Sequence, residues 1–434
     1  MTHTLFFILL ALTFVSGELL IDDIRTYDIP QPLITQNTTE TLKPYRFGLS
    51  IPVSITNELP LLSQETVWQW RIKIHSSGAL SLSFIFDQLW IPKGARVDIF
   101  NQNDRQQILT SQKTRFATKP MAGNTLFLEY TSPFLYPLPK IYLSRVVYGY
   151  RQVPFLKSLS FPGSNQRVIS RNRHSGKCNI DYACDAMSTG WSKEASSVVV
   201  LLTDENQKYC TGAFINNVEQ DGRQLLLTAY HCLTDTSNPA TDMVLLNYQR
   251  QSCRTLNQLN RSPDILHGLV WLGGSNVSDF ALFEVKEPIP DSYDVYLSGW
   301  TTEPEPHPPL TGIHHPSGDF KKISMYDGHL LPSCWDECPE NDHWKVERWT
   351  YGTTESGSSG SPLFDAHHRI VGQLHGGVAS CWYKNGYDMY GSFKDSWRLG
   401  LSDLLDPKHT QHGPLVYLNG VYLNDARNKK VMQS

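Results

Sequence analysis

Hydrophobic and polar positions alternate along the first third of the chain. The alternation is clearest over residues 68–74 and 80–86, and shorter apolar runs follow at 97–100, 126–130 and 141–150. Turns that contain Pro or Gly separate these runs. A side-chain period of two is typical of β-strands with one buried face. The pattern therefore predicts an all-β module with a sandwich-like arrangement.

The second part of the chain continues with short apolar runs, such as 196–202 and 224–228. Evenly spaced short strands with turn residues between them are typical of a barrel or a sandwich. Near the C-terminus, residues 396–405 carry apolar side chains at helical spacing. We expect a short helix there, in an otherwise β-rich unit.

Composition narrows the class of protein. The 434 residues correspond to two or three domains at roughly 150 residues per domain. Lys and Arg number 38 against 42 Asp and Glu, which gives a net charge of −4, and only 18% of residues are charged. A basic nucleic-acid binder and a solvated disordered chain would both carry more charge, so we expect neither.

The N-terminus has the pattern of a secretory signal peptide. Residues 5–15 form an apolar run of 11 residues, and small residues follow at positions 16 and 17. This run is shorter than the roughly 20 residues that span a bilayer. We therefore expect residues 1–17 to be removed and the protein to be secreted without a membrane anchor; the alternative is a buried N-terminal strand or helix. Glycosylation sequons at Asn37, Asn260 and Asn276 agree with secretion.

A basic linker separates a half without cysteines from a half that contains all eight. Residues 151–177 hold no Asp or Glu, and the cysteines lie between Cys178 and Cys381. An exposed basic linker is where a processing protease would cut, with Arg173 and Lys177 both candidates. We therefore expect residues 18–177 to form a removable β-rich region with its linker, and residues 178–434 to form a second domain.

Three segments carry residues suited to nucleophilic catalysis. His231 ends an apolar strand beside a cysteine, Asp279 precedes another apolar run, and Ser359 lies in the glycine-rich turn GSSGSP. Each has an ordinary structural interpretation when taken alone: a core or surface histidine, a turn aspartate and a loop serine. Their order along the chain, His, Asp and Ser, is that of chymotrypsin-type proteases and differs from α/β-hydrolases and subtilisins.

At these residues the chain resembles the trypsin/chymotrypsin superfamily of serine proteases, and more closely its bacterial lysyl endopeptidase branch. The closer resemblance rests on residues 178–181, 228–232, 278–280, 313–316, 355–362, 372–377 and 387–391. Residues 45–101 also resemble the pro-region of those enzymes. The resemblance covers most of 178–410 and implies a chymotrypsin-like double β-barrel, preceded by a β-sandwich-like pro-region.

The resemblance assigns roles that the chemistry also requires. Ser359 would be the nucleophile, and His231 would take its proton and return it to the leaving amine. Asp279 would orient the imidazole and stabilise its charged form. The backbone N–H groups of Gly357 and Ser359 would form the oxyanion hole.

Specificity would come from a downstream acid. Trypsins carry their pocket aspartate six residues before the nucleophile, where this chain has Thr353. The lysyl endopeptidase pattern places an acid at Asp388, where a buried carboxylate would hold a cationic P1 side chain; the alternative is a solvated turn residue. His375 and Gly376 would contact substrate, with Trp335 as a candidate stacking partner of the histidine. The sequence does not decide whether Lys or Arg is preferred at P1.

The resemblance also suggests how six of the cysteines pair. The implied disulfides are Cys178–Cys381, Cys184–Cys253 and Cys210–Cys232. Cys334 and Cys338 have no counterpart in the bacterial pattern, and a small local disulfide between them is expected. With His329 and His343 they also fit a zinc-site spacing, but we predict no metal.

Together these features predict a secreted serine endopeptidase made as a precursor, with Lys preferred at P1. Its partners would be protein or peptide substrates and its own pro-region, acting as an intramolecular chaperone or inhibitor. We expect a monomer with no cofactor, no nucleic-acid partner and no membrane association. The alternatives are a trypsin-fold protease of other specificity and an inactive protease-like binding protein. A metal-dependent hydrolase built on His314, His315 and the Cys/His cluster is less favoured.

Overall fold

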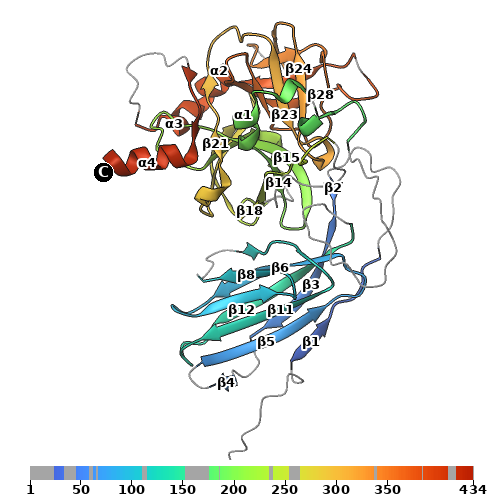
Figure 1. The fold of residues 1–434 in the computed structure, drawn as a ribbon, viewed down its shortest axis with the longest axis vertical. Coiled ribbons are helices and arrows are strands. Elements are labelled where there is room, and N and C mark those ends of the chain that lie inside the picture. The colour runs from blue at the N-terminus through green and yellow to red at the C-terminus, as the bar shows by residue number, and fades with distance from the viewer. Residues whose placement is uncertain are drawn as a thin grey trace, which may run out of the picture.

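The computed structural model describes most of the chain beyond residue 23. The described ranges are 24–33, 45–57, 62–64, 67–109, 115–151, 175–184, 186–233, 238–253, 264–336, 340–383, 385–408 and 417–433. Two bodies are visible in Figure 1: an N-terminal module of residues 24–151, and a C-terminal unit of residues 175–433.

The N-terminal module is a β-sandwich. One sheet has the order β1-β5-β11-β7-β8, with β4 paired to β5. Its strands are β1 (Arg25–Asp28), β4 (Leu62–Gln64), β5 (Val67–His75), β7 (Arg96–Phe100), β8 (Arg105–Ile108) and β11 (Thr125–Ser132). The other sheet has the order β10-β6-β12-β3, with β9 paired to β6. Its strands are β3 (Gly48–Thr56), β6 (Ser81–Trp90), β9 (Phe116–Ala117), β10 (Met121–Ala122) and β12 (Lys140–Gly149).

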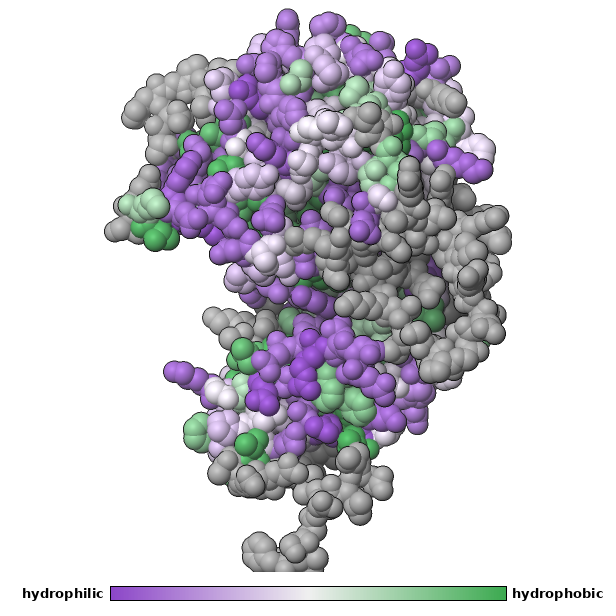
Figure 2. Space-filling view, viewed as in Figure 1, coloured by the Kyte–Doolittle hydropathy of each residue, from purple (hydrophilic) through white to green (hydrophobic). Residues whose placement is uncertain are grey.

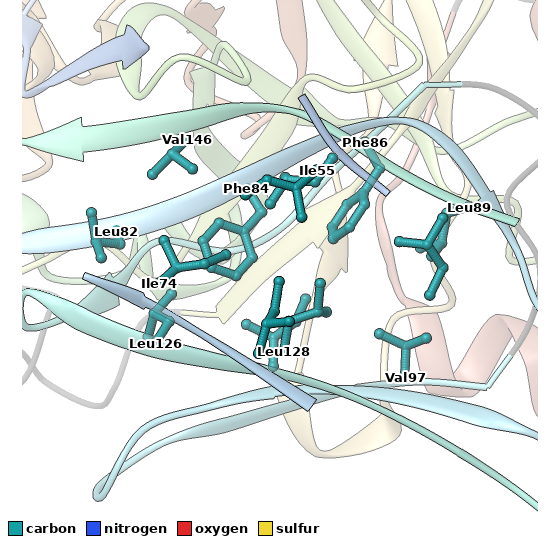
Figure 3. Close-up of a cluster of buried hydrophobic side chains, with 14 of the residues drawn as sticks. Ile55, Ile74, Leu82, Phe84, Phe86, Leu89, Val97, Leu126, Leu128 and Val146 are labelled. Carbon is teal, nitrogen blue, oxygen red and sulfur yellow. The ribbon is translucent and has the colours of Figure 1, made fainter. Parts of the chain in front are cut away.

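The alternation in sequence forms the core of this sandwich. Ile74 and Leu128 of one sheet face Phe84, Phe86 and other residues of the second sheet, and all are fully buried (Figure 3). Because successive side chains of a strand point to opposite faces, the polar residues between them face outward. The prediction of an all-β module with a sandwich-like arrangement is confirmed.

The C-terminal unit is built on two larger sheets. The first has the order β18-β17-β14-β15-β16-β20-β19, and β2 of the N-terminal part pairs with β15. Its strands are β2 (Tyr45–Arg46), β14 (Val198–Leu202), β15 (Gln207–Phe214), β16 (Leu225–Ala229), β17 (Met243–Leu246), β18 (Asp264–His267), β19 (Leu269–Ser275) and β20 (Phe280–Val285).

The second large sheet has the order β13-β24-β23-β27-β28-β29-β26-β25, with β22 paired to β28 and to β30. Its strands are β13 (Ile180–Asp181), β22 (Trp300–Thr301), β23 (Leu310–His314), β24 (Lys322–Tyr326), β25 (Leu331–Ser333), β26 (His343–Val346), β27 (Pro362–Phe364), β28 (Ile370–Gly377), β29 (Asp388–Ser392) and β30 (Tyr417–Leu418). A small pair, β21 (Tyr296–Leu297) and β31 (Val421–Tyr422), lies apart. The fold is all-β, with the chymotrypsin-like double-barrel arrangement that the sequence predicts.

Helices are few and short. They are α1 (Ser192–Ser197), α2 (Phe393–Ser396), α3 (Ser402–Leu405) and α4 (Leu423–Gln433). The predicted helix over 396–405 is present but interrupted, because Gly400 has a φ of 111° between α2 and α3. Residues 196 and 197, expected to begin a strand, instead end α1. Among the described residues, no helix has the length and apolarity needed to cross a bilayer.

The two bodies touch over a limited zone. In Figure 1 the module lies below the C-terminal unit, and β2 reaches up toward β15. The face in Figure 2 is hollowed between the two bodies on one side, and hydrophilic residues predominate on both. The predicted signal peptide and the linker residues 152–174 lie outside the described residues.

Candidate active site

A histidine and an aspartate meet where two neighbouring strands of the first sheet end. β16 ends at Ala229 and leads directly to His231, whereas β20 begins at Phe280, one residue after Asp279. The register pairs Ala229 with Phe280, so the two side chains start from adjacent points. His231 Nδ1 lies 2.7 Å from Asp279 Oδ2, and the His231 N–H donates to Asp279 Oδ1 at 2.8 Å. Both carboxylate oxygens thus hold one histidine.

The turn that carries Asp279 is fixed from the second sheet. Asp279 has a φ of 56°, a left-handed backbone conformation that non-glycine residues adopt at a cost. The preceding carbonyl, Ser278 O, accepts a hydrogen bond from Gln373 Nε2 of β28 at 2.8 Å, and Ser396 Oγ of α2 donates to Ser278 Oγ at 2.9 Å. The carboxylate is 2% exposed. The neighbouring sheet therefore holds this residue in its strained geometry.

The serine turn GSSGSP packs against the strand that leads to His231. Thr211 of β15 donates its N–H to Ser359 O at 2.9 Å and its hydroxyl to Gly357 O at 2.9 Å. Gly360 has a φ of 79°, and a Cβ there would lie 2.7 Å from Ala229 N. Only glycine tolerates both the conformation and the contact. The close approach places the turn that carries Ser359 beside the end of β16, the strand that leads to His231.

The backbone of this turn offers two donors. Within the described part of the chain, neither the Gly357 N–H nor the Ser359 N–H donates to a protein acceptor, while the intervening Ser358 N–H donates to Glu355 O. Gly357 has a φ of 91°, which an L-residue rarely adopts. The N–H groups of Gly357 and Ser359, which flank the hydrogen-bonded N–H of Ser358, can therefore bind a single oxyanion.

Buried His314, a residue of the metal-hydrolase alternative, serves to hold this turn. Its Nδ1 lies 2.8 Å from Ser358 Oγ, and its Nε2 lies 3.1 Å from Ser324 Oγ. Burial lowers the pKa of His314 to about 3, so the ring is neutral near pH 7. His315 is also buried, and its Nδ1 lies 3.0 Å from Asp319 O. Both rings are part of the scaffold under the serine turn.

His375 lies at the centre of an aromatic cluster beside His231 and Asp279. Its ring stacks on Trp335 with centroids 3.7 Å apart and on His231 with centroids 5.3 Å apart. Its Nδ1 lies 3.8 Å from Asp279 Oδ2. Burial lowers the pKa of His375 to about 4, although the Asp279 charge acts in the opposite direction. The His375 ring is therefore neutral near pH 7.

Sequence reasoning missed the role of His343. This fully buried residue hydrogen-bonds through Nε2 to His375 Nδ1 at 2.9 Å, while its Nδ1 lies 2.5 Å from Asp342 Oδ1. An aspartate, a histidine and a second histidine thus form a chain that ends beside the triad residues. The only sequence feature that singled out His343 was its zinc-like spacing to the cysteines, and its ring faces His375.

Asp388 is buried at the start of β29, so it is no solvated turn residue. Its Oδ2 accepts hydrogen bonds from Trp349 Nε1 and Thr354 Oγ1, both at 2.6 Å. The side chain is 1% exposed, and no cationic side chain among the described residues pairs with it. Burial raises the pKa of Asp388 to about 6, although the two hydrogen bonds act in the opposite direction. Such a carboxylate is electrostatically unsatisfied and suited to bind a cation.

Two glycines of β28 pack closely beside this carboxylate. Gly377 is the register partner of Asp388 across β28 and β29, and a Cβ there would clash with the aspartate. A Cβ on Gly376 would lie 3.1 Å from the Trp335 ring. Gly376 and Gly377 therefore place no side chain between Trp335 and Asp388.

The donor atoms of His231, Asp279 and His375 lie within 4.8 Å of one another, and so do those of Cys210, His231 and Cys232. The two cysteines form a disulfide, and the other three residues hydrogen-bond within the cluster just described. The side chains of both groups thus make contacts within the candidate site itself.

The three disulfides implied by the resemblance are present. They are Cys178–Cys381, Cys184–Cys253 and Cys210–Cys232. The third fixes β15 to the residue that follows His231. Cys338 lies outside the described residues, so its pairing with Cys334 stays a prediction.

The remaining predicted sites lie on the surface or outside the described residues. Asn276 is exposed in the turn that precedes Asp279, whereas Asn37, Asn260 and Arg173 lie outside the described residues. Lys177 is exposed, but its neighbours are anchored. Ser175 Oγ donates to Asp319 Oδ2 at 2.7 Å, and the next N–H donates to Glu355 Oε1 at 3.0 Å.

Comparison with known proteins places the chain in a family. The profile of the lysyl endopeptidase C-terminal domain matches residues 172–391, just over half of the chain. The chain belongs to the lysyl endopeptidase family. The match contains His231, Asp279, Ser359 and Asp388, and the N-terminal module lies before it.

A curated lysyl endopeptidase of Pseudomonas aeruginosa is 30% identical over 234 residues, which is 48% of this chain and 46% of that protein. The match thus spans about half the length of this relative. Among solved structures, human heparin binding protein aligns with a TM-score of 0.35 and 15% identity over 51% of this chain and 96% of its own. The HtrA-type protease AlgW with a tripeptide aligns with a TM-score of 0.36 and 14% identity over 52% of this chain and 65% of its own.

Proposed function

We propose that this member of the lysyl endopeptidase family is a serine endopeptidase that cleaves peptide bonds through an acyl-enzyme. The carrying observation is that His231, held by both oxygens of Asp279, lies next to a serine turn with two free N–H donors. His231 accepts the Ser359 proton as Oγ attacks the scissile carbonyl, and then returns it to the leaving amine. The N–H groups of Gly357 and Ser359 bind the oxyanion. Water then hydrolyses the acyl-enzyme.

The preferred P1 residue is lysine. Asp388 supplies one negative charge that has no cationic partner among the described residues, and Gly376 and Gly377 of β28 place no side chain beside it. A primary ammonium ion is a compact charge with three donors, which suits a single carboxylate oxygen that is left over. Trp349 and Thr354 already occupy the other oxygen. The guanidinium of arginine prefers to bind both oxygens of a carboxylate, and only one oxygen of Asp388 is available.

The enzyme is secreted as a precursor. Its signal peptide is residues 1–17, its pro-region with the linker is 18–177, and its protease domain is 178–434. A cut after Arg173 would leave the Ser175 and Gly176 contacts with the C-terminal unit in place, whereas a cut after Lys177 would remove them. We therefore favour Arg173 as the processing position. The disulfides and the sequon at exposed Asn276 fit an oxidising, secretory route.

Three matched peptide amides with Lys, Arg or Phe at P1 test the specificity. We expect kcat/KM to be highest for the Lys amide. The Asp388→Asn variant should lose about 10²–10³-fold on the Lys amide, because it removes one partner of a buried charge pair, and should change little on the Phe amide. Equal cleavage of the Phe and Lys amides by the parent enzyme would overturn the specificity.

A further inference from the structure

One aromatic side chain of the N-terminal part is buried inside the C-terminal unit. Phe47 lies between β2 and β3 and is fully buried. The residues packed around it all belong to the C-terminal unit: Val200, Leu202, Met243, Leu245, Tyr248, Ile265 and Phe320. The module's own core does not contain Phe47. A large aromatic side chain in a fully desolvated pocket is the usual form of an interface hot spot.

Backbone pairing surrounds this anchor. β2 extends the first large sheet at β15, with Arg46 opposite Gln207. The Phe47 N–H donates to Asn206 O at 3.1 Å. An extended segment that adds a strand to a sheet edge, with one side chain in a pocket, is a recurrent mode of protein recognition.

Charge complementarity completes the contact. Glu205, at the turn before β15, pairs with Arg46 at 2.8 Å and with Arg145 of β12 at 2.9 Å. The adjacent Asp204 pairs with Arg115 at 3.3 Å. The module thus presents three arginines to an acidic turn, which selects this partner and its orientation.

None of these contacts involves the linker or the triad residues. The docking surface of the C-terminal unit includes the turn and strand start at 204–207, the Phe47 pocket and His267, which contacts Phe116 of the module. Cleavage between residues 151 and 175 removes a covalent connection but leaves the anchor, the strand pairing and the ion pairs unchanged.

We propose that the N-terminal module stays bound to the C-terminal unit after the linker is cut, as a non-covalent subunit anchored by Phe47. Among the described residues, its surface of attachment is separate from His231, Asp279 and Ser359, so the described part of the module does not cover these residues. This inference rests on the proposed processing, but it makes no use of catalytic activity.

The test uses the full chain with Ser359→Ala, which suppresses self-cleavage, and a recognition sequence for a site-specific protease placed within 152–174. After complete cutting, verified on a denaturing gel, the pieces are examined by size exclusion and native mass spectrometry at pH 7.5. We expect one species with the mass of both pieces. Separation of the pieces as soon as the linker is cut would overturn the proposal.

Variants of the same parent identify the anchor. Phe47→Ala should weaken the complex at least tenfold, whereas Phe134→Ala, at a module residue that is 61% exposed, should leave it unchanged. If the two pieces of the Phe47→Ala protein comigrate as completely as those of the Phe134→Ala protein, the role of Phe47 is overturned. Because Phe47→Ala can also affect folding, Glu205→Gln provides a second test at a partly exposed side chain. It should weaken the complex and reduce its sensitivity to salt.

The outcome does not depend on the proposed function. The Ser359→Ala parent is inactive under that proposal, and cutting is done by an added protease. A protein that fails to cleave peptides can therefore still retain its module, and an active protease can still lose it.

Discussion

Individual side chains of the site differ in how completely they are satisfied. Asp279 has both oxygens engaged by His231, whereas Asp388 accepts two neutral hydrogen bonds at one oxygen and has no cationic partner among the described residues. The same residue type thus serves two purposes, orientation of a base and attraction of a cation. Burial without a counter-charge raises the pKa of Asp388 to about 6.

The Asp388 pKa predicts how a lysine-like ligand depends on pH. A primary alkylamine stays protonated up to about pH 10, so only the carboxylate titrates near pH 6. Because the pKa of Asp388 is raised to about 6, its carboxylate becomes protonated and loses its charge as the pH falls through 6. Calorimetry on the Ser359→Ala protein should show affinity for butylamine about tenfold weaker at pH 5 than at pH 8. A flat affinity over this range, or equal affinity in Asp388→Asn, would rule out the pocket.

His343 should affect catalysis through His375. His343→Ala removes one buried hydrogen bond of about 1 kcal/mol, so we expect kcat/KM for the Lys amide to fall about fivefold. His343 also lowers the pKa of His375, so its removal should move the acid limb of the pH profile to higher pH. The conservative His343→Gln variant should recover part of the rate. An unchanged rate and profile in His343→Ala would show that this residue only fills space.

At the scale of elements, each part of the candidate site is held by strands of both large sheets. His231 and Asp279 follow and precede neighbouring strands of the first sheet, but Gln373 of β28 holds the Asp279 turn. Conversely, the serine turn before β27 is held by Thr211 of the first sheet. The site is therefore complete only when both sheets are in place.

The disulfides predict different effects on stability and on rate. Replacing Cys210 and Cys232 with Ala, or Cys184 and Cys253 with Ala, should each lower the free energy of unfolding by about 2–4 kcal/mol. Only the first pair should also lower kcat, because Cys232 directly follows His231. Chemical unfolding and amide cleavage measure the two effects. Equal kcat in both double variants would contradict the positional role of Cys210–Cys232.

The sequence predicts the triad residues because they lie in short local motifs at the ends of apolar runs. It cannot predict the contact of His343 with His375, since this depends on the register of β26 and β28 across β29. A register shift between Leu374 and Gly376 also changes the local geometry at His375. The Phe47 anchor is equally hidden, because one apolar residue beside a strand does not reveal which body buries it.

In the whole molecule, one strand of the C-terminal unit, β15, contacts both the N-terminal module and the serine turn. β15 pairs with β2 at its start and carries Thr211, the holder of the serine turn, four residues beyond Gln207. The docked module thus contacts the same strand that supports the candidate oxyanion hole. This connection fits a pro-region that assists assembly of the site.

Docking should weaken in acid. Both ring nitrogens of His267 are buried without a hydrogen-bond partner in the described part of the chain, against Phe116 of the module. Burial, and to a smaller extent the charge of Lys119, lowers the pKa of His267 to about 3. The backbone N–H of His267 donates to Glu287 Oε2. A free histidine titrates near 6.5, so protonation favours the undocked state below that pH. The cut protein should bind its module about 30-fold more weakly at pH 5 than at pH 7.5.

One other group at this interface, Asp204, titrates in acid, and burial raises its pKa, so its protonation favours the docked state and opposes the effect of His267. His267→Phe should therefore remove the weakening in acid. A complex equally stable at both pH values in the parent would contradict the assignment.

The covalent step at Ser359 can be measured directly. The processed protein is mixed with an excess of a nitrophenyl ester of a blocked lysine, and the burst of nitrophenol and the intact mass are recorded. We predict a burst of one equivalent and a lysyl adduct on the peptide that contains Ser359, with no adduct and a loss of about 10⁶ in kcat in Ser359→Ala. Undiminished cleavage by Ser359→Ala, or an adduct on another residue, would contradict the account.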